Sequence, residues 1–319
     1  MLKTKFAIGC LVQWYEIEMV GEYIQSVNNA LELVDNPQNI TLDFVLVTNQ
    51  QLEQINDDIS MQKIEDKFMT LLPGTMKINY KITDELYTIA DYRRDFNDKY
   101  CTEVDVLMWG ETDSLIPRQT FQILDSLHQH NVANNVSKYL TFFGTCRMWD
   151  DSWKPVEHNL YTDKPNNQNK EWWGTQYVTS IDEMNKVNDS VTDLDVRVVS
   201  PHKFNGCGLV ISSEIVKAGV NIPKSVFFTH EDTSFMVMTN KILGNVTQFV
   251  IKNILLVHNR NHPKKRLYVK DEVGNSTSEK RDSNSWYKTA SKYSESNVHN
   301  IFNPQYKSLT WEDVWQTIK

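Results

Sequence analysis

The feature that most constrains the fold is an apolar run that turns abruptly acidic, within residues 104–117. Residues 104–110, VDVLMWG, predict a buried strand, and Glu111 and Asp113 follow it before a break at Pro117. Two carboxylates at the end of a buried strand are costly unless something positive lies there. In open α/β sheets, ligands also bind at this end of the strands. The stretch therefore predicts a ligand site at one edge of an α/β sheet.

A hard divalent cation would satisfy both carboxylates, because their oxygens suit Mg²⁺ or Mn²⁺ and leave the ion room for water and phosphate oxygens. His258 directly follows residues 249–257, a second apolar strand-like run, and would complete the metal shell. Two plainer interpretations stay open. Glu111 and Asp113 would form a polar turn that caps a helix starting near Pro117, and His258 would be an ordinary surface residue.

The start of the chain predicts a parallel sheet. Residues 6–12 and 42–48 read as buried strands, and residues 19–33 between them carry apolar side chains at helical spacing. Strand, helix and strand in this order imply a right-handed crossover. The loops after both strands then lie at the same edge, where a nucleotide would bind. The candidate nucleotide contacts in these loops are Gln13, Trp14, Tyr15 and Asn49.

Further elements alternate along the chain. Arg93 and Arg94 lie in one predicted helix, where they would touch a phosphate, hold the acidic loop in place, or simply face solvent. The aromatic side chains within 149–173 predict either a stacking platform for sugars or bases or a small core under long loops. The predicted strands are 77–82, 138–143 and 249–257, the predicted helices are 89–98, 117–128, 212–219 and those starting near Ser180, Thr229 and Thr310, and residues 271–300 are predicted to be loop-like.

A second motif lies within residues 204–235. Gly206 and Gly208 form a glycine-bearing turn that leads into a strand and then a short helix. Glu231 and Asp232 follow in the first turn of another helix. They would either interact favourably with the helix dipole or supply a general base at the mouth of a pocket.

The composition excludes several classes of protein. The net charge of −8 over 319 residues argues against a protein that coats nucleic acid through bulk charge. The four cysteines are widely spaced, which argues against a zinc ribbon or redox motif and favours free thiols in a reducing compartment. No apolar stretch is long enough to span a bilayer. We therefore expect a soluble, cytoplasmic protein, in the host cytoplasm if it is viral.

Taken in sequence order, these motifs resemble those of glycosyltransferases of the GT-A fold, closest in layout to the family 2-like nucleotide-sugar enzymes. Residues 111–113, ETD, lie where that family has its acidic D-x-D metal motif. Residues 205–209, NGCGL, are similar to its acceptor-side glycine turn. Residues 230–232, HED, resemble the E-D pair whose aspartate is the base in inverting members, and His258 lies where some members place a further metal ligand. Two departures are Glu111 for the first aspartate and Thr48-Asn49 for the family's usual aspartates.

The resemblance implies a GT-A, Rossmann-like, mixed and mainly parallel sheet flanked by helices over residues 1–262. A basic, polar C-terminal extension with a docking helix follows over residues 263–319. It also implies metal-dependent transfer from a nucleotide sugar, a UDP-sugar above all, with Mn²⁺ or Mg²⁺ held by Glu111, Asp113 and His258. Asp232, beside Glu231, would be the base of an inverting reaction.

The acceptor stays open between a glycan, a protein, a small molecule and a modified DNA base. In the last case, as in some phage DNA glycosyltransferases, the basic residues 264–266 would contact phosphates and the aromatic residues of 149–173 would receive an extruded hydroxymethylated base. A nucleotidyltransferase also uses paired carboxylates and a metal, although the chain lacks a glycine-rich phosphate loop with a lysine after its first strand. A non-catalytic sugar-binding protein is the third alternative.

Overall fold

The computed structural model describes residues 1–72, 77–147, 180–199, 206–259, 262, 264–270 and 285–319. Over these residues, nine strands form one sheet in the order β3-β2-β1-β4-β8-β6-β9-β5, with β7 paired to β9. The strands are β1 (Phe6–Gln13), β2 (Ile40–Val47), β3 (Ile78–Thr83), β4 (Val106–Glu111), β5 (Ser114–Leu115), β6 (Tyr139–Arg147), β7 (Val196–Val198), β8 (Val210–Ser212) and β9 (Thr247–His258).

The longest strand pairings are parallel. β1 lies between β2 and β4 and is parallel to both, and β3 continues this parallel half as the edge strand. β6 and β9 form a second parallel pair, whereas β8 is antiparallel to both of its neighbours, β4 and β6. The sheet is thus mixed and mainly parallel, which confirms the predicted fold class, including the edge strand and the first crossover.

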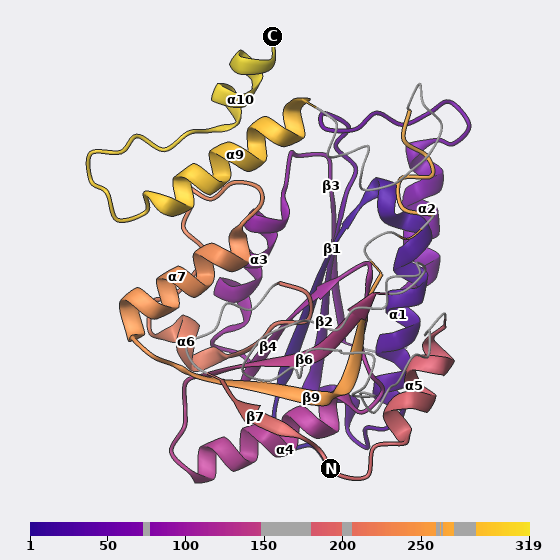
Figure 1. The fold of residues 1–319 in the computed structure, drawn as a ribbon. Coiled ribbons are helices and arrows are strands. Elements are labelled where there is room, and N and C mark those ends of the chain that lie inside the picture. Colours follow the sequence, from indigo (N-terminus) through magenta and orange to yellow (C-terminus); the bar gives the residue numbers. More distant parts are fainter. Residues whose placement is uncertain (73–76, 148–179, 200–205, 260–261, 263, 271–284) are drawn as a thin grey trace, which may run out of the picture.

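Helices cover both faces of the sheet (Figure 1). α1, α2 and α5 lie on one side, and α3, α6 and α7 lie on the other. The helices are α1 (Ile17–Glu32), α2 (Met61–Leu71), α3 (Ile89–Tyr100), α4 (Thr120–Ala133), α5 (Ile181–Asp189), α6 (Ser213–Lys217), α7 (Glu231–Leu243), α9 (Ser285–His299) and α10 (Trp311–Ile318).

The side chains of β1 alternate between two cores, as expected for a central strand. Ile8 and Cys10 join the core beneath α1, and Ala7 and Leu11 join the core beneath α3. Between them, a Cβ at Gly9 would come within 2.6 Å of the Tyr92 and Phe96 side chains, so α3 packs directly on the strand. This close packing fixes the height of α3 over the sheet, and with it the position of the arginines on that helix.

The loop-like interpretation of residues 271–300 is wrong for its second half, because α9 occupies residues 285–299. Ala290, Ser294 and Val298 lie four residues apart and are buried, which is helical spacing. Two of these three residues are small or polar, so the buried face is inconspicuous in the sequence. None of the helices in the described part of the chain has the length and apolarity that a membrane-spanning segment requires.

Candidate active site

A cleft of about 180 Å³ lies at the carboxyl ends of β1 and β4, the edge that the sequence predicts for a ligand. Several separate parts of the chain form its walls. They include the loop after β1 with Gln13, Tyr15 and Glu16, the end of β4 with Glu111, Thr112 and Asp113, the start of α3 with Thr88 and Ile89, and later residues that include Phe228, Thr229, Lys265, Trp286 and Tyr287.

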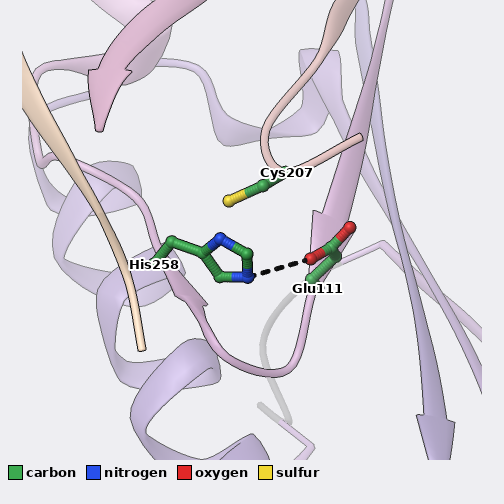
Figure 2. A group of neighbouring side chains, drawn as sticks. All are labelled: Glu111, Cys207 and His258. Carbon is green, nitrogen blue, oxygen red and sulfur yellow. Dashed lines mark ion pairs between the residues drawn. The ribbon is translucent and has the colours of Figure 1, made fainter. Parts of the chain in front are cut away.

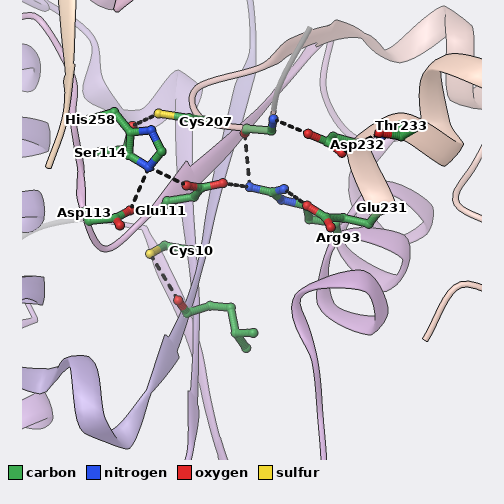
Figure 3. A network of polar contacts seen from close by, with 12 residues as sticks. Cys10, Arg93, Glu111, Asp113, Ser114, Cys207, Glu231, Asp232, Thr233 and His258 are labelled. Atoms are coloured by element: carbon green, nitrogen blue, oxygen red, sulfur yellow. Dashed lines mark hydrogen bonds and ion pairs between the residues drawn. The ribbon is translucent and has the colours of Figure 1, made fainter. Parts of the chain in front are cut away.

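The three predicted metal ligands meet beside this cleft: Glu111 and Asp113 line it, and His258 lies against both carboxylates (Figure 3). His258 Nε2 lies 3.5 Å from Glu111 Oε2 and 3.6 Å from Asp113 Oδ1. Strand pairing explains the meeting, because β5 runs antiparallel to β9 and sets Ser114 opposite His258. Burial lowers the pKa of His258, but Cys207 and Asp113 outweigh burial and hold this pKa well above its usual value. The surroundings of His258 therefore favour positive charge.

Cys207 is a fourth member of this group that the sequence did not single out (Figure 2). One ligand atom each from Glu111, Cys207 and His258 lie within 4.8 Å of one another. The Cys207 sulfur also contacts Ser114 Oγ at 3.1 Å. A lone cysteine in a glycine turn has no spacing motif, so only the fold reveals its neighbours.

Lys265 neutralises part of the acidic cluster. Its Nζ lies 2.8 Å from Asp113 Oδ2 and 3.5 Å from Glu16 Oε1. Burial raises the pKa of Asp113, but Lys265 and His258 outweigh burial and hold this pKa well below its usual range. Asp113 is thus a carboxylate at neutral pH.

The basic cluster of residues 264–266 is not the exposed phosphate-binding patch that the sequence suggested. Lys265 and Arg266 are buried, and Arg266 pairs with Glu53 while its guanidinium lies 4.5 Å from the centre of the Tyr15 ring. Lys264 alone of these three is exposed. The segment is held against the first half of the sheet, since the Arg266 amide donates to the Tyr15 carbonyl.

Arg93 joins the acidic strand end to α7. Its guanidinium forms ion pairs with Glu111 and Glu231 and donates to the Gly206 carbonyl at 3.1 Å (Figure 3). It also lies 4.7 Å from the centre of the Trp109 ring, and only 1% of the side chain is exposed. Of the predicted roles for Arg93, the structure supports holding the acidic loop and excludes a solvated helix face.

Glu231 and Asp232, both in the first turn of α7, have different surroundings. Glu231 is buried, and burial raises its pKa to about 7 although Arg93 opposes the rise. Asp232 is half-buried, and its Oδ2 accepts a hydrogen bond from the Gly206 amide at 3.1 Å. The Thr233 amide donates to the other oxygen, Oδ1. Backbone donors therefore orient Asp232, whereas an ion pair holds Glu231.

The two predicted glycine contacts shape the turn that carries Cys207. A Cβ at Gly206 would lie 2.1 Å from Arg93 Nη1, so only glycine lets the guanidinium approach. Gly208 has φ +71°, the left-handed region that glycine adopts without strain. The fold itself therefore requires glycine at both positions, whether or not a ligand binds there.

Three predicted nucleotide contacts are corrected by the structure. Trp14 is fully buried, and its indole N–H donates to the Asn49 carbonyl, so its ring cannot stack on a ligand. Asn49 uses its side-chain amide to bind the Asp84 carbonyl. Arg94 donates to the carbonyls of residues 222, 223 and 226 and does not reach the cleft. Gln13 and Tyr15 do line the cleft, while the aromatic residues of 149–173 lie outside the described residues.

No protein-family model matches this chain, and no curated protein matches it in sequence. Solved structures with a similar fold include residues 1–349 of TarS from S. aureus, at TM-score 0.49 and 10% identity, covering 98% of this chain and 78% of that one. TarS in complex with UDP-GlcNAc matches at TM-score 0.49 and 9% identity, with 93% and 73% covered. A mycobacterial protein matches at TM-score 0.43 and 9% identity, with 82% and 69% covered. These likenesses concern the fold alone.

Proposed function

We propose that this chain is a metal-dependent glycosyltransferase that moves a sugar from a nucleotide-sugar donor to an acceptor hydroxyl. The observation that carries the proposal is the meeting of His258 with Glu111 and Asp113, two carboxylates that line one cleft, although His258 is separated from them by well over a hundred residues. Paired carboxylates with one imidazole at a sheet edge are a suitable set for a cation that binds a diphosphate.

The charge around this group fits a divalent cation. The carboxylates of Glu16, Glu111, Asp113, Glu231 and Asp232 face only Arg93 and Lys265 as permanent cations among the described residues nearby. The excess of negative charge would attract a metal ion, held by Glu111, Asp113 and His258. Such an ion would neutralise charge on the leaving diphosphate. Two oxygen ligands and one nitrogen favour Mn²⁺ or Mg²⁺, although Cys207 offers a softer alternative ligand.

Asp232 is the better candidate for the general base. Glu231 is bound by Arg93 in a buried ion pair, so its carboxylate is not free to approach an acceptor. Asp232 is less buried, and its orientation is fixed by the Gly206 and Thr233 amides. Thr229, three residues earlier, lines the cleft. Asp232 would take the proton from the acceptor hydroxyl as it attacks the anomeric carbon, which inverts the configuration.

Gln13 and Tyr15 form the wall where the nucleoside would lie, beside Lys265 and the acidic group. UDP-GlcNAc, which TarS binds, is the first donor to test. The runner-up activity is nucleotidyl transfer, which would release pyrophosphate from a nucleoside triphosphate and a sugar phosphate.

The test is release of UDP from UDP-GlcNAc and other UDP-sugars, with Mn²⁺ and with EDTA. Asp232→Asn should lower turnover by roughly 10²-fold or more, the usual size of a general-base contribution, and leave UDP affinity unchanged. Asp182→Asn is the matched control, because Asp182 also lies in the first turn of a helix but is remote from the cleft. Absence of metal-dependent UDP binding would overturn the proposal, and pyrophosphate release would favour the runner-up.

A further inference from the structure

One wall of the cleft consists of three aromatic rings that the proposed chemistry does not use. Phe228, Trp286 and Tyr287 line the same cleft as Glu111 and Asp113. Their ring centroids are 5.5–5.7 Å apart in all three pairings, and the rings meet edge to face. We call these three residues the aromatic wall.

The aromatic wall is rigidly backed. Phe228 precedes α7, and its ring also contacts Trp311 of α10 at 5.5 Å. Trp315 stacks on Trp311 at 5.3 Å on the far side of this cluster, and Ala290 and Val314 are buried beneath it. The rings of the wall are half-buried, which leaves part of each surface accessible. A backed, partly exposed aromatic surface is pre-organised for a ligand, so that little entropy is lost on binding.

The charge of the rest of the cleft selects the chemistry of that ligand. Glu16, Glu111 and Asp113 are acidic and Lys265 is basic, so these side chains carry a net negative charge and disfavour a phosphodiester backbone when no metal is bound. Carboxylates accept hydrogen bonds from hydroxyl groups, and aromatic rings cover the apolar C–H face of a sugar ring. A neutral carbohydrate offers both kinds of surface. A nucleic acid offers an aromatic base together with charges that the cleft disfavours.

We propose that the aromatic wall is the acceptor subsite and that it binds a neutral pyranose ring. This inference rests on the proposed function, because it takes the donor to occupy the Gln13 and Tyr15 wall. The chain runs from Phe228 through Thr229, which both line the cleft, into the first turn of α7, where Asp232 lies four positions after Phe228. A sugar held against Phe228 would therefore lie toward the helix start that carries the proposed base. The acceptor is then a glycan or glycoside rather than a DNA base.

The experiment measures binding of simple probes to the full chain by saturation-transfer NMR. The probes are the methyl β-glycosides of glucose, galactose and N-acetylglucosamine, and a short oligonucleotide with 5-hydroxymethylcytosine. Trp286→Ala should weaken glycoside binding at least about tenfold, a typical loss when a stacking aromatic is removed. Trp286→Phe should restore most of it. Trp315→Ala is the matched control, because it removes an equal ring from the same cluster outside the cleft.

Each result bears on the proposal. Glycoside binding that falls in Trp286→Ala and persists in Trp315→Ala supports it. Absence of binding by every glycoside, or binding that Trp286→Ala does not change, overturns it. Oligonucleotide binding that alone depends on Trp286 also overturns it, in favour of a nucleic-acid acceptor. If Trp286→Ala unfolds, Trp286→Leu, which keeps apolar bulk but removes the aromatic ring, is judged by the same criterion. UDP binding is measured in parallel, so failure of the donor site is distinguished from failure of the aromatic wall.

Discussion

Replacing Arg93 by methionine tests whether this side chain holds the acidic group together. The substitution keeps a long apolar side chain over Trp109 but removes the charge that pairs with Glu111 and Glu231. Glu231 would be left buried without a cation, and Glu111 would lose its direct partner. Breaking a buried ion pair by removing one partner costs about 3–5 kcal/mol. We therefore expect Arg93→Met to lower the free energy of unfolding by about that amount at pH 8.

The loss of stability in Arg93→Met should depend on pH, and the titration of Glu231 determines whether the loss grows or shrinks as pH rises. Its folded-state pKa is about 7, raised by burial above the usual 4.5, so its protonated form stabilises the fold below pH 4.5 and this contribution is lost as pH rises through 7. Arg93 opposes the rise, so its removal moves the pKa of Glu231 higher still. At pH 8 the first unit of this rise adds about 1 kcal/mol, and the addition levels off near about 1.4 kcal/mol once the pKa exceeds 8. At pH 5, Glu231 is largely protonated with or without Arg93, so the cost is smaller.

The measurement is urea unfolding of both proteins at pH 5 and pH 8. Arg94→Met is the matched control, because Arg94 lies on the same helix and is also buried, but it binds the backbone carbonyls of residues 222, 223 and 226, and its one carboxylate partner, Asp91, is only half-buried, unlike Glu231. Its loss should destabilise the protein without this pH dependence. A cost below about 1 kcal/mol for Arg93→Met, or the same cost at both pH values, would refute the reasoning.

Three further substitutions test other parts of the site. Gly110→Ala should cost about 1–3 kcal/mol in urea unfolding, because the added Cβ would lie 2.0 Å from Tyr23 Oη. Lys265→Met should weaken UDP binding about tenfold or more in calorimetry, since the acidic cluster loses its cation. Cys207→Ser should leave Mn²⁺ affinity unchanged and lower Zn²⁺ affinity, because sulfur prefers the softer ion; an equal loss for both ions would contradict the hard ligand set.

The sequence predicts the strands that carry this site, because each strand is marked by a local pattern. Apolar runs mark β1, β4 and β9, and the polar residues after them must lie at a sheet edge. Glu111, Asp113 and His258 therefore come together as predicted. The pairing of Ser114 with His258 determines the distances between the three ligands. This pairing could not be predicted, since strand register depends on the whole sheet.

The predictions that failed concern side chains whose role depends on a distant partner. Trp14 looks the same in the sequence whether it stacks on a ligand or is buried, and the difference is its hydrogen bond to the Asn49 carbonyl. The basic run at 264–266 looks like a surface patch until Glu53 and Asp113 are found opposite it. Such pairs have no periodicity, so no local pattern reveals them.

The same pairs predict what the C-terminal extension contributes to the fold. Lys265 and Arg266 lie beyond the predicted boundary at residue 262, yet they neutralise Asp113 and Glu53, which are 5% and 7% exposed. A chain that ends at residue 262 would leave Glu53 buried without Arg266 and Asp113 with His258 but without Lys265, at a cost of up to about 3–5 kcal/mol each. This sum approaches the whole stability of a typical domain, about 5–15 kcal/mol.

We therefore expect residues 1–262 alone to lack cooperative unfolding in circular dichroism. A chain that ends at residue 309 is the control, because it removes α10 and keeps both cations. That control should stay folded, with loss of the contacts of Trp311 with Phe227 and Phe228 and of the buried Val314 side chain, but of neither cation. A 1–262 fragment that unfolds at the urea midpoint of the full chain would show that these ion pairs do not stabilise the fold. The boundary at residue 262 would then separate two independent units, and the first unit alone would form a cleft that lacks Lys265 and Trp286.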